Sequence, residues 1–256
     1  WVNGSGNPSA TKVWLTDAQL DALVLQGLTP STTYGVKVKA KNQDGDETAL
    51  SAEGQGATLP DTSPPTPTPM TFSSAPANDV AAQISMTATA GSDLTPPVNY
   101  LFALDNTNCG ANAGTGGTSS SWQSSASYSD TGLEPNKCYG YTVTARDSAT
   151  PTPNTGLPSG ISSAYTSANT PGTPTLSGAT ATTLNLTNAE NGNPSSNPTT
   201  SFAVQVTYTN PSDATWLNKW VNGSGNPSAT AVWLTDAQLD ALVLQGLTPS
   251  TTYGVK

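Results

Sequence analysis

Few residues in this chain could carry out chemistry. The 256-residue sequence contains no histidine and two cysteines, Cys109 and Cys138. A serine or cysteine nucleophile needs a base beside it, which is most often histidine. The sequence also lacks a Gly-x-Ser-x-Gly turn and a phosphate-binding loop. We therefore expect no enzymatic activity, no catalytic residue and no cofactor.

The two cysteines have each other as the simplest partner. A structural zinc site needs four ligands, and two cysteines without histidine do not supply them. The composition, with 10% charged residues, 23 Gly and 21 Pro, is typical of a secreted protein. In such a chain an even number of cysteines indicates disulfides. We predict a disulfide between Cys109 and Cys138, and no metal site.

Three further groups of residues have both a structural and a functional interpretation. The acidic segment 42–47 offers oxygen ligands, but it lacks the spacing of an EF-hand loop and fits a solvated hairpin tip better. Lys37, Lys39 and Lys41 lie on one face of an alternating strand, which is either solvated or in contact with an acidic neighbouring module. Four tryptophans either fill a core or line a sugar-binding surface: Trp14, Trp122, Trp216 and Trp220.

The elements that must position these residues are repeated. Residues 1–37 return as residues 220–256, and Lys12 against Ala231 is the one difference. The sequence is thus one period of 219 residues plus the start of the next, which is the mark of a tandem array. A period of this length fits two domains of about 110 residues. We expect the partners to be further copies of the same repeat, in the same chain or head-to-tail, and favour covalent continuity over strand exchange between chains.

The charge balance limits other partners. The net charge is −9, which disfavours nucleic acid and anionic membrane as partners. No apolar run approaches the roughly 20 residues that span a bilayer, so we expect no membrane insertion. Extracellular polysaccharide remains a candidate partner through the tryptophans.

A pattern of leucine, proline and tyrosine links the chain to a known family. Leu28-x-Pro30-x-x-x-Tyr34 precedes an alternating strand, and the same pattern ends at Tyr139 and at Tyr253. These segments resemble the second half of fibronectin type III-like domains, and residues 121–135 resemble segments of such modules in secreted and surface bacterial proteins. The resemblance implies an all-β fold of tandem seven-stranded Greek-key β-sandwiches. It also implies that Tyr34, Tyr139 and Tyr253 form tyrosine corners, each hydroxyl bonding back to the preceding turn.

The resemblance sets the expected domain boundaries. It places Cys109 at the end of one strand and Cys138 at the start of its antiparallel neighbour, and the alternation of residues 81–90 predicts a strand before them. Pro/Thr-rich segments are expected to act as semi-rigid linkers. The expected order is the C-terminal part of a sandwich (1–60), a linker (61–76), a complete sandwich with the disulfide (77–166), a linker (167–174) and the N-terminal part of a sandwich (175–256).

Near-identity of successive copies favours an architectural function. We expect a non-catalytic segment of a secreted or cell-surface protein, whose repeats build an extracellular fibre, stalk or matrix filament. The alternatives are the stalk of a cell-surface adhesin and spacer modules in a secreted polysaccharide-degrading enzyme.

Overall fold

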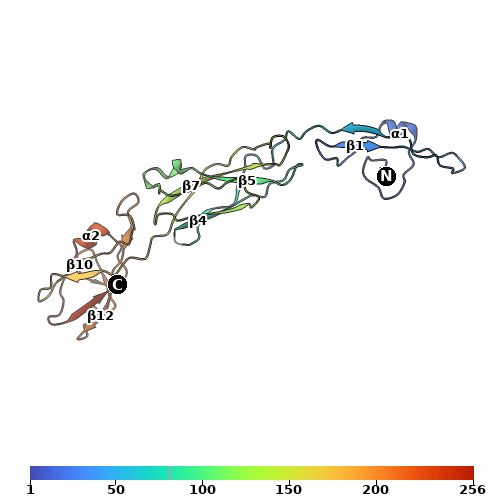
Figure 1. Ribbon diagram of the computed structural model, residues 1–256. Helices are drawn as coiled ribbons and strands as arrows, with labels where there is room; N and C mark the ends of the chain where they lie inside the picture. Colours follow the sequence, from blue (N-terminus) through green and yellow to red (C-terminus); the bar gives the residue numbers. More distant parts are fainter. Residues whose placement is uncertain (81) are drawn as a thin grey trace.

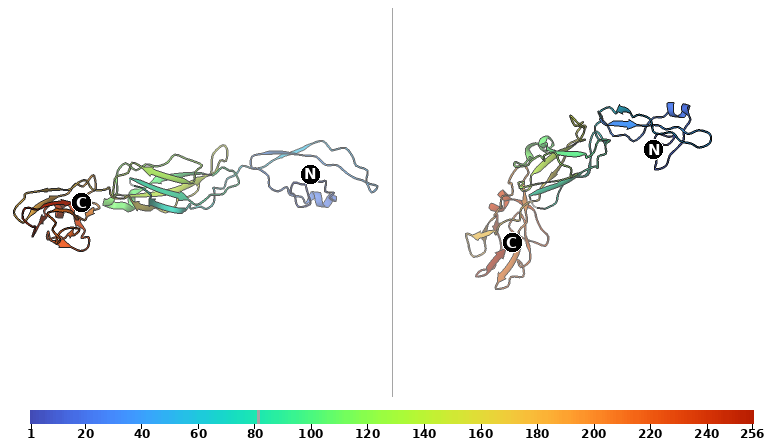
Figure 2. Two further views of the ribbon diagram at one scale, coloured as in Figure 1. Left: turned by 90° about the horizontal axis from the view of Figure 1, so that it is seen from below. Right: turned by 45° about the vertical axis from the view of Figure 1, so that its right-hand side comes forward.

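The computed structural model describes residues 1–80 and 82–256, which form three β units arranged in a row (Figure 1). Figure 2 shows the same order from two other directions, with the first and third units at opposite ends. Among the residues described, helical structure is limited to three short segments: α1 (Asp17–Asp21), η1 (Asn106–Asn112) and α2 (Asp236–Asp240). No helix among the described residues has the length and apolar character needed to cross a membrane. The expected all-β fold is confirmed.

The central unit is a sandwich of two three-stranded antiparallel sheets. The first has the order β3-β4-β6, with β3 (Phe72–Asn78), β4 (Gln83–Ala88) and β6 (Ser127–Thr131). The second has the order β5-β7-β8, with β5 (Asn99–Leu104), β7 (Cys138–Arg146) and β8 (Ser162–Tyr165). The β4 strand lies within the expected strand 81–90, whose residue 81 is outside the described residues.

The seventh strand position is held by a single bridge. Residue Gln123 pairs with Tyr100 through two backbone hydrogen bonds of 2.7 and 3.0 Å, beside the free edge of β5. In chain order the strands therefore form the A-B-E and C′-C-F-G sheets of a fibronectin type III-like sandwich.

The expected linker 61–76 belongs largely to the central unit, which corrects that boundary. Met70 is 1% exposed and lies in the central core, and β3 begins at Phe72. On the N-terminal side of β3, Thr66 already pairs with Ser92 of the central unit. The side chains of Met70 and Phe72 explain the different boundary, because packing them on the sandwich stabilises an otherwise extended Pro/Thr segment.

The third unit also consists of antiparallel strands, in one three-stranded sheet and three strand pairs. One sheet has the order β16-β10-β9, and the other pairs are β12 with β17, β11 with β15, and β13 with β14. Its strands are β9 (Thr175–Ser177), β10 (Leu184–Thr187), β11 (Ser201–Phe202), β12 (Val206–Asn210), β13 (Trp220–Val221), β14 (Pro227–Ser228), β15 (Leu234–Thr235), β16 (Val243–Leu244) and β17 (Thr252–Val255).

The first unit contains one strand pair, β1 (Thr33–Val36) with β2 (Gly54–Ala57). The turns of residues 1–37 match those of residues 220–256. Thr16 and Gln19 form the expected capping box of α1, as Thr235 and Gln238 do for α2. The repeated sequence thus has the same local fold in both places.

Candidate functional site

The apolar side chains of the repeated sequence differ in burial between its two copies. In residues 220–256, seven of them belong to one core cluster and are at most 8% exposed. Their counterparts in residues 1–37 are all at least partly exposed. We call these counterparts the open face: Val2, Leu15, Leu20, Leu23, Leu25, Leu28 and Tyr34.

The exposure of single leucines gives the size of the difference. Leu20 is 42% exposed, whereas the identical residue Leu239 is fully buried. Burying a leucine side chain completely is worth roughly 1.5–3 kcal/mol. Nine of the fifteen exposed large hydrophobic side chains lie in residues 1–60.

Residues 175–219 cover the second copy, and we call them the covering segment. Its strand β10 pairs with β16, and β12 pairs with β17. Backbone bonds run from Leu186 N–H to the Leu242 carbonyl (3.1 Å) and from Leu247 N–H to the Thr182 carbonyl (3.0 Å). The covering segment therefore pairs with the strand edges of the second copy and also buries its apolar face.

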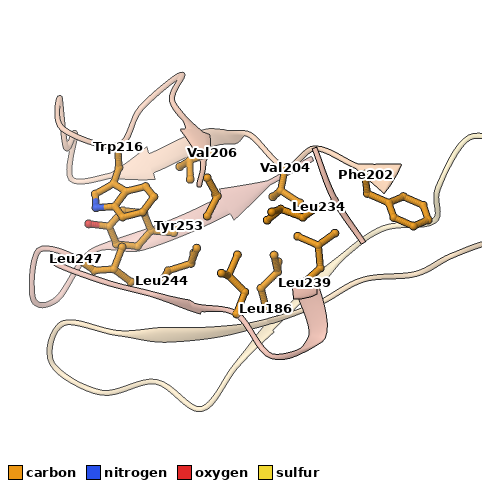
Figure 3. Packing of buried hydrophobic residues seen from close by; sticks show 12 residues of the cluster. Leu186, Phe202, Val204, Val206, Trp216, Leu234, Leu239, Leu244, Leu247 and Tyr253 are labelled. Atoms are coloured by element: carbon orange, nitrogen blue, oxygen red, sulfur yellow. The ribbon is translucent and has the colours of Figure 1, made fainter. Parts of the chain in front are cut away.

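Five side chains of the covering segment complete the core. Figure 3 shows Trp216 beside Tyr253 and Leu247, and Leu186 among the leucines of the second copy. Trp216 and Val206 are fully buried. The five residues are Leu186, Phe202, Val204, Val206 and Trp216.

The three corner tyrosines each accept a backbone hydrogen bond from the residue five positions earlier. The bonds come from Thr29 to Tyr34 (2.8 Å), from Glu134 to Tyr139 (2.9 Å) and from Thr248 to Tyr253 (2.8 Å). The Tyr139 hydroxyl donates to the Thr115 carbonyl (2.7 Å).

Tyr253 has an additional partner from the covering segment. Its hydroxyl donates to Asp213 Oδ2 at 2.6 Å, and the Thr248 hydroxyl donates to the same atom at 2.9 Å. The Tyr253 hydroxyl bond holds the pKa of Asp213 below its usual value. Burial first, and then the bond to Asp213, raises the pKa of Tyr253. At Tyr34, by contrast, bonding with Thr29 lowers the pKa.

Cys109 and Cys138 are joined by a disulfide in the central unit. Cys138 begins β7. Cys109, however, lies in η1 rather than at the end of β5, since the chain leaves the sheet after Leu104 and Asp105 caps the helical segment. The bond therefore fixes η1 onto the β7 strand.

The acidic segment 42–47 and the lysine stripe contact each other. Asp46 N–H donates to the Asn42 side chain (2.8 Å), which closes a hairpin tip. Glu47 binds Lys12 (2.6 Å) and Lys39 (2.7 Å), and these lysines, Lys12 first, lower its pKa to about 2. Lys41 lies 4.9 Å from the centre of the Trp14 ring.

The tryptophans divide between core and surface. Trp216 is buried in the third unit, and Trp122 stacks under the Arg146 guanidinium at 4.3 Å. Trp14 is 38% exposed, and Trp220 is half-buried beside Gln205. The most exposed tryptophan is Trp233, at 68%. Sequence reasoning did not single it out.

One acidic cluster was not predicted. Asp61, Asp93 and Asp147 each present a carboxylate oxygen, and these oxygens lie within 4.8 Å of one another, so they could hold a metal ion. Burial raises the pKa of Asp93. Protein donors already bond to the carboxylates: the Thr95 hydroxyl to Asp61 (2.6 Å) and Asn154 N–H to Asp147 (2.6 Å). The cluster thus also serves to tie residue 61 to the central unit.

A scan against protein-family models finds no match, and a search of curated proteins finds none. Among solved structures, the chain is similar to the chicken CNTN1 FN1-FN3 domains, with 13% identity, 89% of this chain and 69% of that chain covered, and a TM-score of 0.31. It is also similar to domains d3-d4 of the rat CD45 extracellular region, with 16% identity, coverage of 62% and 76%, and a TM-score of 0.32. The strand order of the central unit decides the fold. It is fibronectin type III-like.

Proposed function

We propose that this chain is a non-catalytic segment of a secreted or surface protein, whose tandem repeats of two sandwiches build an extracellular fibre, stalk or matrix filament. Residues 1–37 and 220–256 have almost the same sequence and form the same capping box, glycine turn and tyrosine corner. This single observation supports the proposal, because sandwiches that recur with a fixed period along one chain produce a periodic rod.

Two further features support an extracellular rod. The central unit carries a disulfide, and structural disulfides persist in oxidising compartments. The three units lie in a row, and hydrogen bonds connect the second to the third, such as that from Asn136 to Thr200 (2.9 Å). A recurring junction of this kind produces a periodic filament.

Electron microscopy of the protein from its natural source tests this function. The expected image is a filament whose axial period contains two sandwiches. Isolated globular particles would rule the proposal out. Intact mass measurement provides an independent check, since an array requires a mass well above that of the 256 residues.

The exposed tryptophans support polysaccharide as a possible accessory partner of the same rod. Aromatic side chains that face solvent can stack on sugar rings, and Trp233 and Trp14 have this exposure. Glycan-array binding by the chain, compared with a Trp233→Ala variant, tests this role. Equal binding by both would remove Trp233 from it.

A further inference from the structure

We infer that a clasp of polar side chains holds the third unit in one orientation on the central unit, so that these two sandwiches move as a single rigid body. The clasp has two parts: the turn of residues 134–137 in the central unit, and the segment 167–170 between the units. The inference goes beyond the proposed function, because it concerns the joint inside one chain and holds whether or not a fibre forms.

The turn before Tyr139 contacts the third unit through two side chains. The Asn136 amide donates to the Thr200 hydroxyl at 2.9 Å, and the Lys137 ammonium donates to the Asn197 carbonyl at 2.5 Å. Thr200 is 5% exposed, so its bond to Asn136 is largely shielded from water and is stronger for it. Because the two bonds end on different residues of one loop, together they resist rotation of the third unit.

The segment between the two units is bonded on both sides. At its start, the Ser167 carbonyl accepts from Asn136 N–H (3.1 Å), and Ser167 N–H donates to the Asn78 side chain (3.3 Å). Two residues later, Asn169 N–H donates to the Asn193 side chain (2.7 Å), which donates back to the Asn169 carbonyl (2.9 Å). One residue therefore separates the bonds to the central unit from the bonds to the third, which leaves little backbone freedom at the joint.

The amides on the third-unit side of the joint have their partners. Asn193 is 3% exposed, and its side-chain amide donates a second bond to the Glu190 carbonyl (2.7 Å), so that its oxygen and both of its N–H groups are used. The Asn191 amide donates to the Thr170 carbonyl (2.8 Å). A buried amide that loses its partner carries a desolvation penalty. Another orientation of the segment would break these bonds, so the observed one is favoured.

The side chains of the clasp are particular to the central unit. The turns before the other two corner tyrosines have serine and threonine in the places of Asn136 and Lys137. The backbone at the first of these positions is left-handed in all three turns, with φ of +49° at Asn136, +51° at Ser31 and +56° at Ser250. The turn thus forms with either pair of residues, whereas the bonds to the next sandwich require the amide and the ammonium.

Exchanging this pair gives a test that preserves the turn. The double variant Asn136→Ser, Lys137→Thr has the residues of the other two turns and lacks both side-chain bonds to the third unit. The orientation is measured by residual dipolar couplings of the 256-residue chain with a lanthanide tag fixed to the central unit. In the wild-type chain, amides of the third unit should report the same alignment tensor as those of the central unit. In the double variant, couplings of the third unit should fall by about half or more, because domains that lose a specific contact move relative to each other.

The matched control is Glu134→Thr, which gives the same turn another residue of its counterparts. The Glu134 carboxylate bonds to Thr115 within the central unit, so this variant should keep the shared tensor. Weak couplings of the third unit in the wild-type chain would overturn the inference, and so would equal couplings in the double variant and the wild type. A loss in the control as large as in the double variant would also contradict it. A shared tensor together with globular particles in microscopy refutes the fibre alone.

Discussion

Residues 1–37 and 220–256 are almost the same sequence in two environments. Both copies form the capping box, the left-handed glycine turn and the tyrosine corner. They differ in burial, because the covering segment packs on the second copy. Turns and caps are thus determined locally, whereas the core depends on a partner segment about 40 residues away in the sequence. Identical residues should consequently contribute very different amounts to stability.

The largest expected effect comes from the same substitution in the two copies. Leu239→Ala removes a fully buried side chain and should destabilise the third unit by about 2–5 kcal/mol. Leu20→Ala changes a residue that is 42% exposed and should alter stability by no more than about 0.5 kcal/mol. Hydrogen exchange of residues 234–247 in the native chain measures the local free energy of unfolding.

Equal costs at Leu20 and Leu239 would break the comparison. They would mean that the side chain of Leu20 is as well packed in solution as that of Leu239.

Sequence reasoning recovers the parts of the structure that depend on nearby residues. The capping box at Thr16 and Gln19 and the repeat itself were predicted. The boundary at residues 61–76 was not, because Met70 and Phe72 pack against residues far along the chain. Residues 1–60 were predicted to be only the C-terminal part of a sandwich, from the repeat and the tyrosine pattern. The burial of each leucine in the second copy could not be predicted in the same way, because it depends on strands about 40 residues earlier in the chain.

The central unit provides an internal reference whose stability depends on the disulfide. Replacing Cys109 and Cys138 with alanine opens a loop with a sequence separation of 29 and should lower the stability of this unit by roughly 3–4 kcal/mol in the chain-entropy treatment. The third unit should keep its stability. Hydrogen exchange of β7 against β17 separates the two effects, and a loss in both would show that the units unfold together.

A smaller effect is expected from the partner that only Tyr253 has. Asp213→Asn removes the charge that accepts the Tyr253 and Thr248 hydroxyls and should cost about 1.5–3 kcal/mol at neutral pH. The folded pKa of Asp213 is lowered, so its contribution is complete above the ordinary pKa of about 3.9 and is lost as the pH falls through the folded value. Stability of the third unit from pH 7 to 2 measures this, and the variant should show a shallower decline.

The smallest effect concerns the one position that differs. Lys12→Ala gives the first copy the residue found at Ala231 and removes one of the two lysines that bind Glu47. The pKa of Glu47 should rise from about 2 toward its ordinary value of about 4.3, as measured by NMR titration. The fold of the open face should not change, and an unchanged pKa would show that Lys39 alone holds the carboxylate.

The position of the central sandwich has a consequence for folding. As the chain folds, the covering segment meets two acceptors of almost the same sequence, residues 1–37 and 220–256. Mispairing of this kind is a characteristic failure of proteins with similar neighbouring repeats. The central sandwich is closed by its own core and lies between the two acceptors in Figures 1 and 2. Alternating two kinds of sandwich thereby keeps identical sequences apart while each one folds.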